Sequence, residues 1–95
     1  MILYDTPRTV MFRGRDRRSS HLMSDIPGHE GQVELDAFAA SIGLIAAWRQ
    51  KSGTPTEHYD LFDGAIGRAS RKGALLVSPR ELVERCVRPK RALMG

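Results

Sequence analysis

The chain has 95 residues, of which 41% are hydrophobic, with one cysteine and a net charge of +4. This length favours one domain and excludes two, and the lone Cys86 excludes an internal disulfide and a cysteine-based structural zinc site. Asp5 and Pro7 interrupt the first apolar residues, so we expect neither a secretory signal nor a membrane span, and a cytoplasmic location.

The charge is distributed unevenly. Residues 1–20 carry five arginines against two aspartates, residues 21–67 carry two bases against seven acids, and residues 68–95 carry eight bases against two glutamates. Such asymmetry steers an anionic partner to one surface, or lets the basic ends and the acidic middle attract each other. A domain of this size buries only about two thirds of the surface that its unfolded chain exposes. A homodimer that covers the remaining apolar area is therefore also possible.

Short strands are expected near the start of the chain. Residues 2–5 form an apolar run that ends at Asp5, and residues 9–12 extend or pair with it. Residues 13–32 have no helical or alternating period and contain several glycines and a proline. This stretch predicts a long loop, with a short strand at residues 21–23 as an option.

Two helices are predicted in the middle of the chain. Residues 33–42 place apolar side chains at helical spacing, and Gly43 with Leu44 forms a left-handed C-terminal cap. Residues 61–72 repeat the pattern, although Gly64 and Gly67 weaken that helix, and Gly73 ends it.

The last elements are a strand and a capped helix. Residues 74–77 are a short apolar run typical of a buried parallel strand, and Ser78, with Pro79 and Glu81 after it, is a helix N-cap. Pro89 is expected to stop this helix, which leaves 89–95 as a basic tail. We therefore expect one α/β domain over residues 1–88, with a small, mostly parallel sheet of two to four short strands packed against about three helices.

Two histidine–aspartate pairs are the first candidate site. His21 with Asp25, and His58 with Asp60, supply groups for general acid–base catalysis or for a metal with open positions. In the structural alternative, His58 and Asp60 cap the following helix and His21 bonds a loop carbonyl. The sequence assigns neither a metal nor a cofactor.

Other polar residues are candidates for ligand binding. Asp5 and Ser78 follow the first and last strands, at the end where ligands bind in parallel sheets. Arg13 and Arg15 belong to an arginine cluster with Phe12, which suits phosphate groups but is equally typical of a solvated loop.

Four further residues have plainer interpretations. His29 lies among glycines and is expected in solvent, Cys86 is expected in the core, and Trp48 with Gln50 lines either a pocket or the core. The phosphate-binding, dinucleotide-binding, hydrolase and zinc-protease motifs are absent from the sequence.

Taken together, these sequence features resemble those of a family of short bacterial and phage proteins described as domain of unknown function 4031. The resemblance is carried by Asp5 after the first strand, "GR" at 14–15, "HLMSD", "ELDAFAASIGL", Trp48 with Gln50, "HYDL" and "GALLVSPREL". The chain departs from the family at Asp36, where histidine is common, and at Arg49, where an aromatic is common. The resemblance implies that His21, Asp25, His58, Tyr59 and Asp60 belong to family signatures, and it assigns no substrate.

Two hypotheses follow. In the first, the domain binds, or as an enzyme hydrolyses, an anionic, phosphorylated or nucleotide-like ligand at the His/Asp site, with Asp5, Arg13, Arg15, Tyr59 and Ser78 contributing to binding. In the second, it is a non-enzymatic, phage-type accessory protein that binds nucleic acid or a host protein through its basic surfaces.

Overall fold

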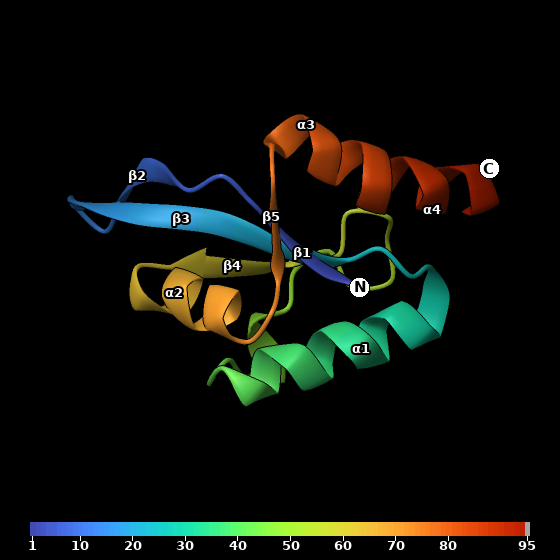
Figure 1. Cartoon of the computed structure of the whole chain (residues 1–95), viewed down its shortest axis with the longest axis horizontal. Coiled ribbons are helices and arrows are strands. Elements are labelled where there is room, and N and C mark those ends of the chain that lie inside the picture. Colours follow the sequence, from blue (N-terminus) through green and yellow to red (C-terminus); the bar gives the residue numbers. More distant parts are fainter. Residues whose placement is uncertain (95) are drawn as a thin grey trace.

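The structure of the protein is a computed structural model, which describes residues 1–94. A mixed β-sheet forms the central layer, with helices α1 (Gly28–Ser41) and α2 (Gly64–Arg71) on one face and a C-terminal helix on the other (Figure 1). Between residues 1 and 94 the sheet has five strands: β1 (Ile2–Asp5), β2 (Arg8–Phe12), β3 (Arg15–Ser24), β4 (Tyr59–Phe62) and β5 (Leu75–Val77). The α/β class is confirmed.

The sheet is mostly antiparallel, so the predicted parallel arrangement of two to four strands is wrong. β3 pairs antiparallel with β1 and β2 along one edge and with β4 along the other, and β1 pairs parallel with β5. The physical reason is the tight turn at Arg13 and Gly14, where φ is 52° and 80°. Two consecutive positive φ values are those of a hairpin turn, which returns β3 alongside β2.

The predicted loop at 13–32 is wrong as well, because β3 and the first turns of α1 occupy most of it. The strand has no simple alternation that the sequence could reveal. Its first part, with Arg15 and Asp16, is exposed, whereas Leu22 and Met23 at its other end are both buried, one on each face of the sheet. Period-two patterning appears only where a single face is buried.

Helix α1 (Gly28–Ser41) begins five residues before the predicted start and ends close to the predicted end. Gly43 has φ of 89°, its N–H donates to the Ala40 carbonyl, and the Leu44 N–H donates to the Ala39 carbonyl at 2.9 Å. This confirms the predicted glycine cap. A short 3-10 turn, η1 (Ala46–Trp48), follows.

The helix predicted over 61–72 is instead a strand followed by a shorter helix. β4 includes Asp60, and α2 (Gly64–Arg71) begins after Asp63, whose φ is 47°. Neither His58 nor Asp60 therefore caps a helix, and that alternative is wrong. β5 follows as predicted, beside β1.

The C-terminal helix consists of α3 (Pro79–Leu82), a π-helical segment η2 (Val83–Val87) and α4 (Arg88–Met94). Ser78 caps it as predicted, since its Oγ accepts the Glu81 N–H at 3.0 Å. Pro89 does not stop the helix, and the predicted tail is helical through Met94. The Arg88 N–H donates to the Val83 carbonyl, five residues back, so the widened turn ends just before the proline ring.

Each face of the sheet has its own core. Leu22, Leu35 and Leu61 belong to the cluster beneath α1 and α2, whereas Leu3, Val77 and Cys86 belong to the cluster beneath the C-terminal helix. Cys86 is fully buried, as expected. Among the helices of residues 1–94, none has both the length and the apolar character that crossing a bilayer requires.

Candidate functional site

The structure brings His21, His58 and Asp60 together on one side of the sheet. His21 on β3 is the direct cross-strand partner of Asp60 on β4, and His58 immediately precedes β4 and pairs with Gln50 through an isolated bridge. One potential ligand atom from each of the three side chains lies within 4.8 Å of the others. The two imidazole rings meet edge to face, with centroids 5.3 Å apart.

Asp5 holds His21 in place from the end of β1. Its Oδ2 lies 3.0 Å from His21 Nδ1, and its Oδ1 accepts the His21 main-chain N–H at 2.7 Å and the Ser20 hydroxyl at 2.9 Å. Burial by itself would raise the pKa of Asp5, but these hydrogen bonds outweigh it and hold the pKa below its usual value. Since an ionised carboxylate only accepts, His21 Nδ1 carries the proton and its Nε2 is left for a ligand.

His58 is oriented by the main chain. Its Nδ1 lies 2.7 Å from the Thr56 carbonyl oxygen, which also only accepts, so this nitrogen is protonated and Nε2 faces Asp60 Oδ1 at 3.3 Å. The Asp60 carboxylate raises the pKa of His58 against the effect of burial, and His58 in turn lowers the pKa of Asp60. The other oxygen of Asp60 accepts a hydrogen bond from the Gln50 amide.

The resulting donor set is rich in lone pairs. When the histidines are neutral, both Nε2 atoms and the Asp60 carboxylate are acceptors, and His58 Nε2 lies 3.3 Å from Asp60 Oδ1. A proton or a metal cation relieves this concentration of electron density. Two imidazoles and one carboxylate can therefore hold a metal ion or exchange protons with a ligand.

The remaining residues of the predicted His/Asp site and its strand-end neighbours lie elsewhere. The Asp25 carboxylate is 2.7 Å from the Met1 amino group, and Ser78 is occupied by capping α3. Tyr59 is buried on the opposite face of β4, where its hydroxyl donates to Asp36 at 2.6 Å. Burial and Asp36 raise the pKa of this phenol to about 12.

Arg13 and Arg15 are also remote from the histidines. Arg15 is paired with Phe12 at the far end of the hairpin, six positions before His21 on β3. At about 3.3 Å per residue, this places about 20 Å between them along the strand.

A cleft of about 570 Å³ opens beside the three-residue cluster and includes Asp60. Gln50 and the largely exposed Trp48 line it, consistent with the pocket alternative for these two residues. Arg17, Phe62 and Arg68 also line the cleft. Arg17 belongs to the arginine cluster seen in the sequence, whereas Phe62 and Arg68 were not predicted to contribute to a site. Phe62 follows Asp60 by two positions, which would have placed it on the same face had the strand been recognised.

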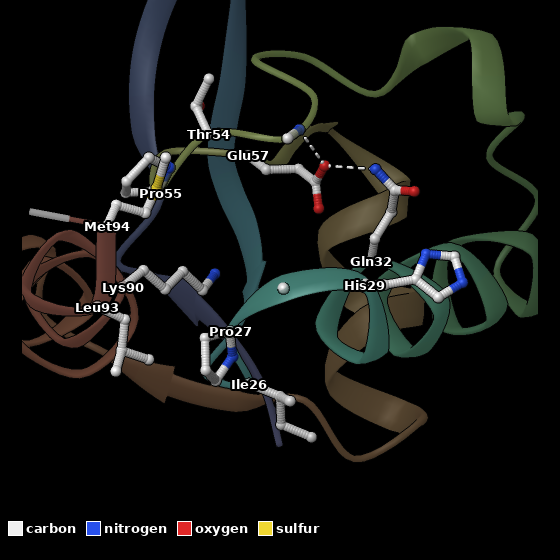
Figure 2. Close-up of a pocket in the computed structure, with 12 residues that line it drawn as sticks. Ile26, Pro27, His29, Gln32, Thr54, Pro55, Glu57, Lys90, Leu93 and Met94 are labelled. Carbon is white, nitrogen blue, oxygen red and sulfur yellow. Dashed lines mark hydrogen bonds between the residues drawn. The ribbon is translucent and has the colours of Figure 1, made fainter.

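A second cavity, of about 560 Å³, lies between the start of α1, residues 53–57 and α4 (Figure 2). The Lys90 and Glu57 side chains enter it from different sides. Lys90 Nζ donates to the Ser24 carbonyl at 2.7 Å, and the Glu57 carboxylate accepts from the Gln32 amide and the Gly53 N–H. None of the three clustered residues lines this cavity, so it is a separate feature.

The sequence was also compared with known proteins. The model of the family described as "Protein of unknown function (DUF4031)" matches residues 2–89. The chain belongs to this family. No curated protein and no solved structure matches the chain. The DUF4031 match includes β1, β3 and β4, and hence every residue of the cluster and the carboxylate of Asp5.

Proposed function

We propose that this DUF4031 domain binds a divalent transition-metal ion through His21, His58 and Asp60, and binds an anionic, phosphorylated ligand at that ion. The observation that carries the proposal is the commitment of both Nδ1 atoms to fixed acceptors, which leaves the Nε2 atoms of two clustered histidines available beside a carboxylate. Hydrogen bonding of the distal ring nitrogen to a carboxylate or carbonyl is the usual arrangement around metal-binding histidines.

The donor types select the class of metal. Imidazole nitrogen suits zinc, iron, cobalt and nickel, whereas calcium and magnesium prefer oxygen ligands. Three protein ligands leave positions open for water and for a ligand, as in catalytic rather than structural sites. Gln50 fixes the orientation of the Asp60 carboxylate, because its amide donates a hydrogen bond to the second oxygen of Asp60.

The neighbouring cleft favours an anion. Arg17 and Arg68 line it together with Asp60, so a phosphoryl group at the metal would have guanidinium groups within the same cleft. A metal at such a site lowers the pKa of water, which supports hydrolysis of a phosphate ester. In that reaction the oxygen of water bonds to phosphorus, the ester P–O bond breaks, and the departing alkoxide takes up a proton released by the water.

Metal binding is tested by calorimetry and cobalt absorption. After treatment with a chelator and dialysis, the protein is titrated with Zn²⁺, and with Co²⁺ while visible absorption is recorded. We expect one ion per chain, and loss of binding in His21→Ala and in His58→Ala. His29→Ala is the matched control, since His29 is exposed in the first turn of α1 and lies outside the cluster. Binding that survives both site substitutions contradicts the proposal.

Ligand binding and hydrolysis are tested on the metal-loaded protein. Inorganic phosphate should change the Co²⁺ spectrum, and bis(p-nitrophenyl) phosphate should release nitrophenol at a rate that His58→Ala and chelation abolish. An unchanged spectrum in the presence of phosphate counts against the anionic ligand. Binding of phosphate without turnover limits the function to ligand binding.

A further inference from the structure

The β2–β3 hairpin projects from the body of the domain (Figure 1), and one of its faces continues onto β4 through the pairing of β3 with β4. Register shows which side chains share this face, because directly paired residues point the same way. Arg8 pairs with Ser19, which in turn pairs with Phe62. Further along the hairpin the pairs are Val10 with Arg17 and Phe12 with Arg15.

Aromatic rings and guanidinium groups are layered on this face. The Phe12 and Phe62 rings lie with their centroids 5.0 Å apart. The Arg17 guanidinium lies 4.6 Å from the centroid of Phe62 and 5.5 Å from that of Phe12, and Arg13 lies 5.4 Å from that of Phe12. Phe12 keeps 36% of its surface exposed. An exposed ring among guanidinium groups offers a partner both an aromatic face and positive charge.

The same face is strongly positive. By register Arg8, Arg15 and Arg17 lie on it, and Arg13 lies over the Phe12 ring beside them. Arg18 and Asp16 lie on the other face of the hairpin, where they pair with Thr9 and Met11. Arg17 is fixed by Asp63, with Nε 2.7 Å from the carboxylate. Within residues 1–94, Arg8, Arg13 and Arg15 form no salt bridge, so their charges are available to a partner.

We infer that this face binds single-stranded nucleic acid, with bases stacked on Phe12 and Phe62 and phosphates paired with Arg8, Arg13 and Arg15. Stacking requires the flat faces of bases, which a duplex conceals within its own stack, whereas a single strand exposes them. Unpaired guanidinium groups supply the complementary charge for the backbone. Binding at this face needs no metal and is therefore independent of the proposed metal site.

The cleft described above connects this face with the cluster. Phe12, Arg17 and Phe62 line the same cleft as Asp60, and Phe62 is two residues from Asp60 on β4. A strand lying on the aromatic rings is therefore next to Asp60, one of the three clustered residues. If the metal site hydrolyses phosphate esters, this juxtaposition makes a phosphodiester its substrate, and that extension rests on the proposed function.

Fluorescence anisotropy with short labelled oligothymidylate and oligouridylate tests the inference, with EDTA present throughout so that no metal contributes. We expect both single strands, or one of them, to bind at least about tenfold more tightly than a duplex of the same length, and the tighter one identifies DNA or RNA as the partner. Binding should weaken steeply as salt increases, because each phosphate contact releases counterions.

Paired substitutions localise the binding to this face. Arg13→Gln with Arg15→Gln should weaken binding and make the slope of log affinity against log salt shallower by about 1.4, since each contact to a single strand contributes about 0.7. Arg88→Gln with Arg91→Gln removes the same charge from exposed positions of α4 and should leave affinity within about twofold.

A second pair separates stacking from charge. Phe12→Leu should weaken binding by at least about fivefold, whereas Met11→Leu, on the opposite face of the hairpin, should have little effect. Because EDTA is present throughout, a failure of the metal proposal leaves these binding results unchanged, which distinguishes it from a failure of this one. The inference is overturned if no single strand binds, if a duplex binds equally well, or if the α4 variants lose as much affinity as the hairpin variants.

Discussion

His21 Nδ1 lies 3.0 Å from Asp5 Oδ2, and the other oxygen of the same carboxylate accepts the His21 main-chain N–H at 2.7 Å. One buried carboxylate therefore fixes both the backbone and the ring of a single residue. The contact joins the end of β1 to the middle of β3, next to the point where the chain leaves β1 for β2. It selects the tautomer in which Nε2 of His21 is free for a ligand.

Replacing Asp5 with asparagine tests this positioning role. The Asn amide would donate to Nδ1, which moves the ring proton to Nε2 and blocks that nitrogen as a metal ligand. We expect Asp5→Asn to lower Zn²⁺ affinity by about 10–100-fold without removing a ligand. It should also lower the free energy of unfolding by about 1–3 kcal/mol. Calorimetric titration and urea unfolding measure the two effects.

Asp16→Asn is the control for that substitution, because Asp16 is exposed on the hairpin and lies outside the cluster. It removes the same charge and should change neither Zn²⁺ affinity nor the unfolding midpoint appreciably. Equal losses of affinity in the two variants would mean that net charge, rather than the Asp5–His21 contact, sets metal affinity.

Ser78 was predicted to bind a ligand, and the structure gives its side chain a capping role. Ser78→Ala should lower the free energy of unfolding by about 1 kcal/mol, because the Glu81 N–H loses its acceptor. Zn²⁺ and phosphate affinities should not change. Ser78→Asn, which retains a capping oxygen, should recover most of the stability. A loss of phosphate affinity in both variants would show that Ser78 contributes to ligand binding after all.

Features that depend on a few neighbouring residues were predicted correctly from the sequence. The Gly43 cap and the Ser78 cap each depend on neighbouring residues alone, and both occur as predicted. The strand at 75–77 also has a local signal, because its short apolar run lies between a glycine turn and a helix cap. Pro89 shows the limit of such signals. A proline normally ends a helix because its ring clashes with the preceding turn, but here the widened π-helical turn before Pro89 lets the helix continue.

Features that depend on pairing between distant segments were not predicted. The four residues of β4 are too few to distinguish a strand from the start of a helix. The proximity of His21 and Asp60 follows from the register of β3 on β4, which no local pattern specifies. The partner of His58 Nδ1 is a main-chain carbonyl, so no side chain in the sequence could have indicated it.

The lowered pKa of Asp36 predicts how the free energy of unfolding changes at low pH. Burial alone would raise the pKa of Asp36, but hydrogen bonds from Tyr59 and Arg49 outweigh it and hold the pKa below the ordinary value of 3.8. A lowered pKa in the folded state means that the stabilisation is complete above pH 3.8 and is lost as pH falls through the folded value. The relevant window therefore lies below about pH 4.

Asp36→Asn should cost about 1–2 kcal/mol at neutral pH, because the ion pair with Arg49 is lost. The difference from the unmodified protein should shrink as pH falls below about 4, where Asp36 itself becomes neutral. Urea unfolding at a series of pH values measures this. A destabilisation that stays constant down to the lowest pH would show that packing, and not the charge of Asp36, accounts for the cost.

Two helical glycines should respond to alanine with opposite signs, because they differ in the space around them. At Gly31 in α1, a Cβ atom would lie 1.8 Å from the Ile26 carbonyl oxygen, a backbone atom that cannot swing away. The Ile26 N–H donates to Ser24 Oγ, which itself donates to Glu34, so this segment is held in place. At Gly67 in α2, the nearest atom is 3.2 Å away and belongs to the flexible end of Arg71.

Gly31→Ala should therefore lower the free energy of unfolding by about 3 kcal/mol, because the start of α1 must move away from Ile26. Gly67→Ala should raise it by up to about 1 kcal/mol, since alanine favours the helix and Arg71 can shift to make room. Thermal and urea unfolding of the two variants measure the difference. Equal destabilisation by both would mean that the close approach of α1 to Ile26 does not limit that position, and that α2 is packed more tightly than its contacts indicate.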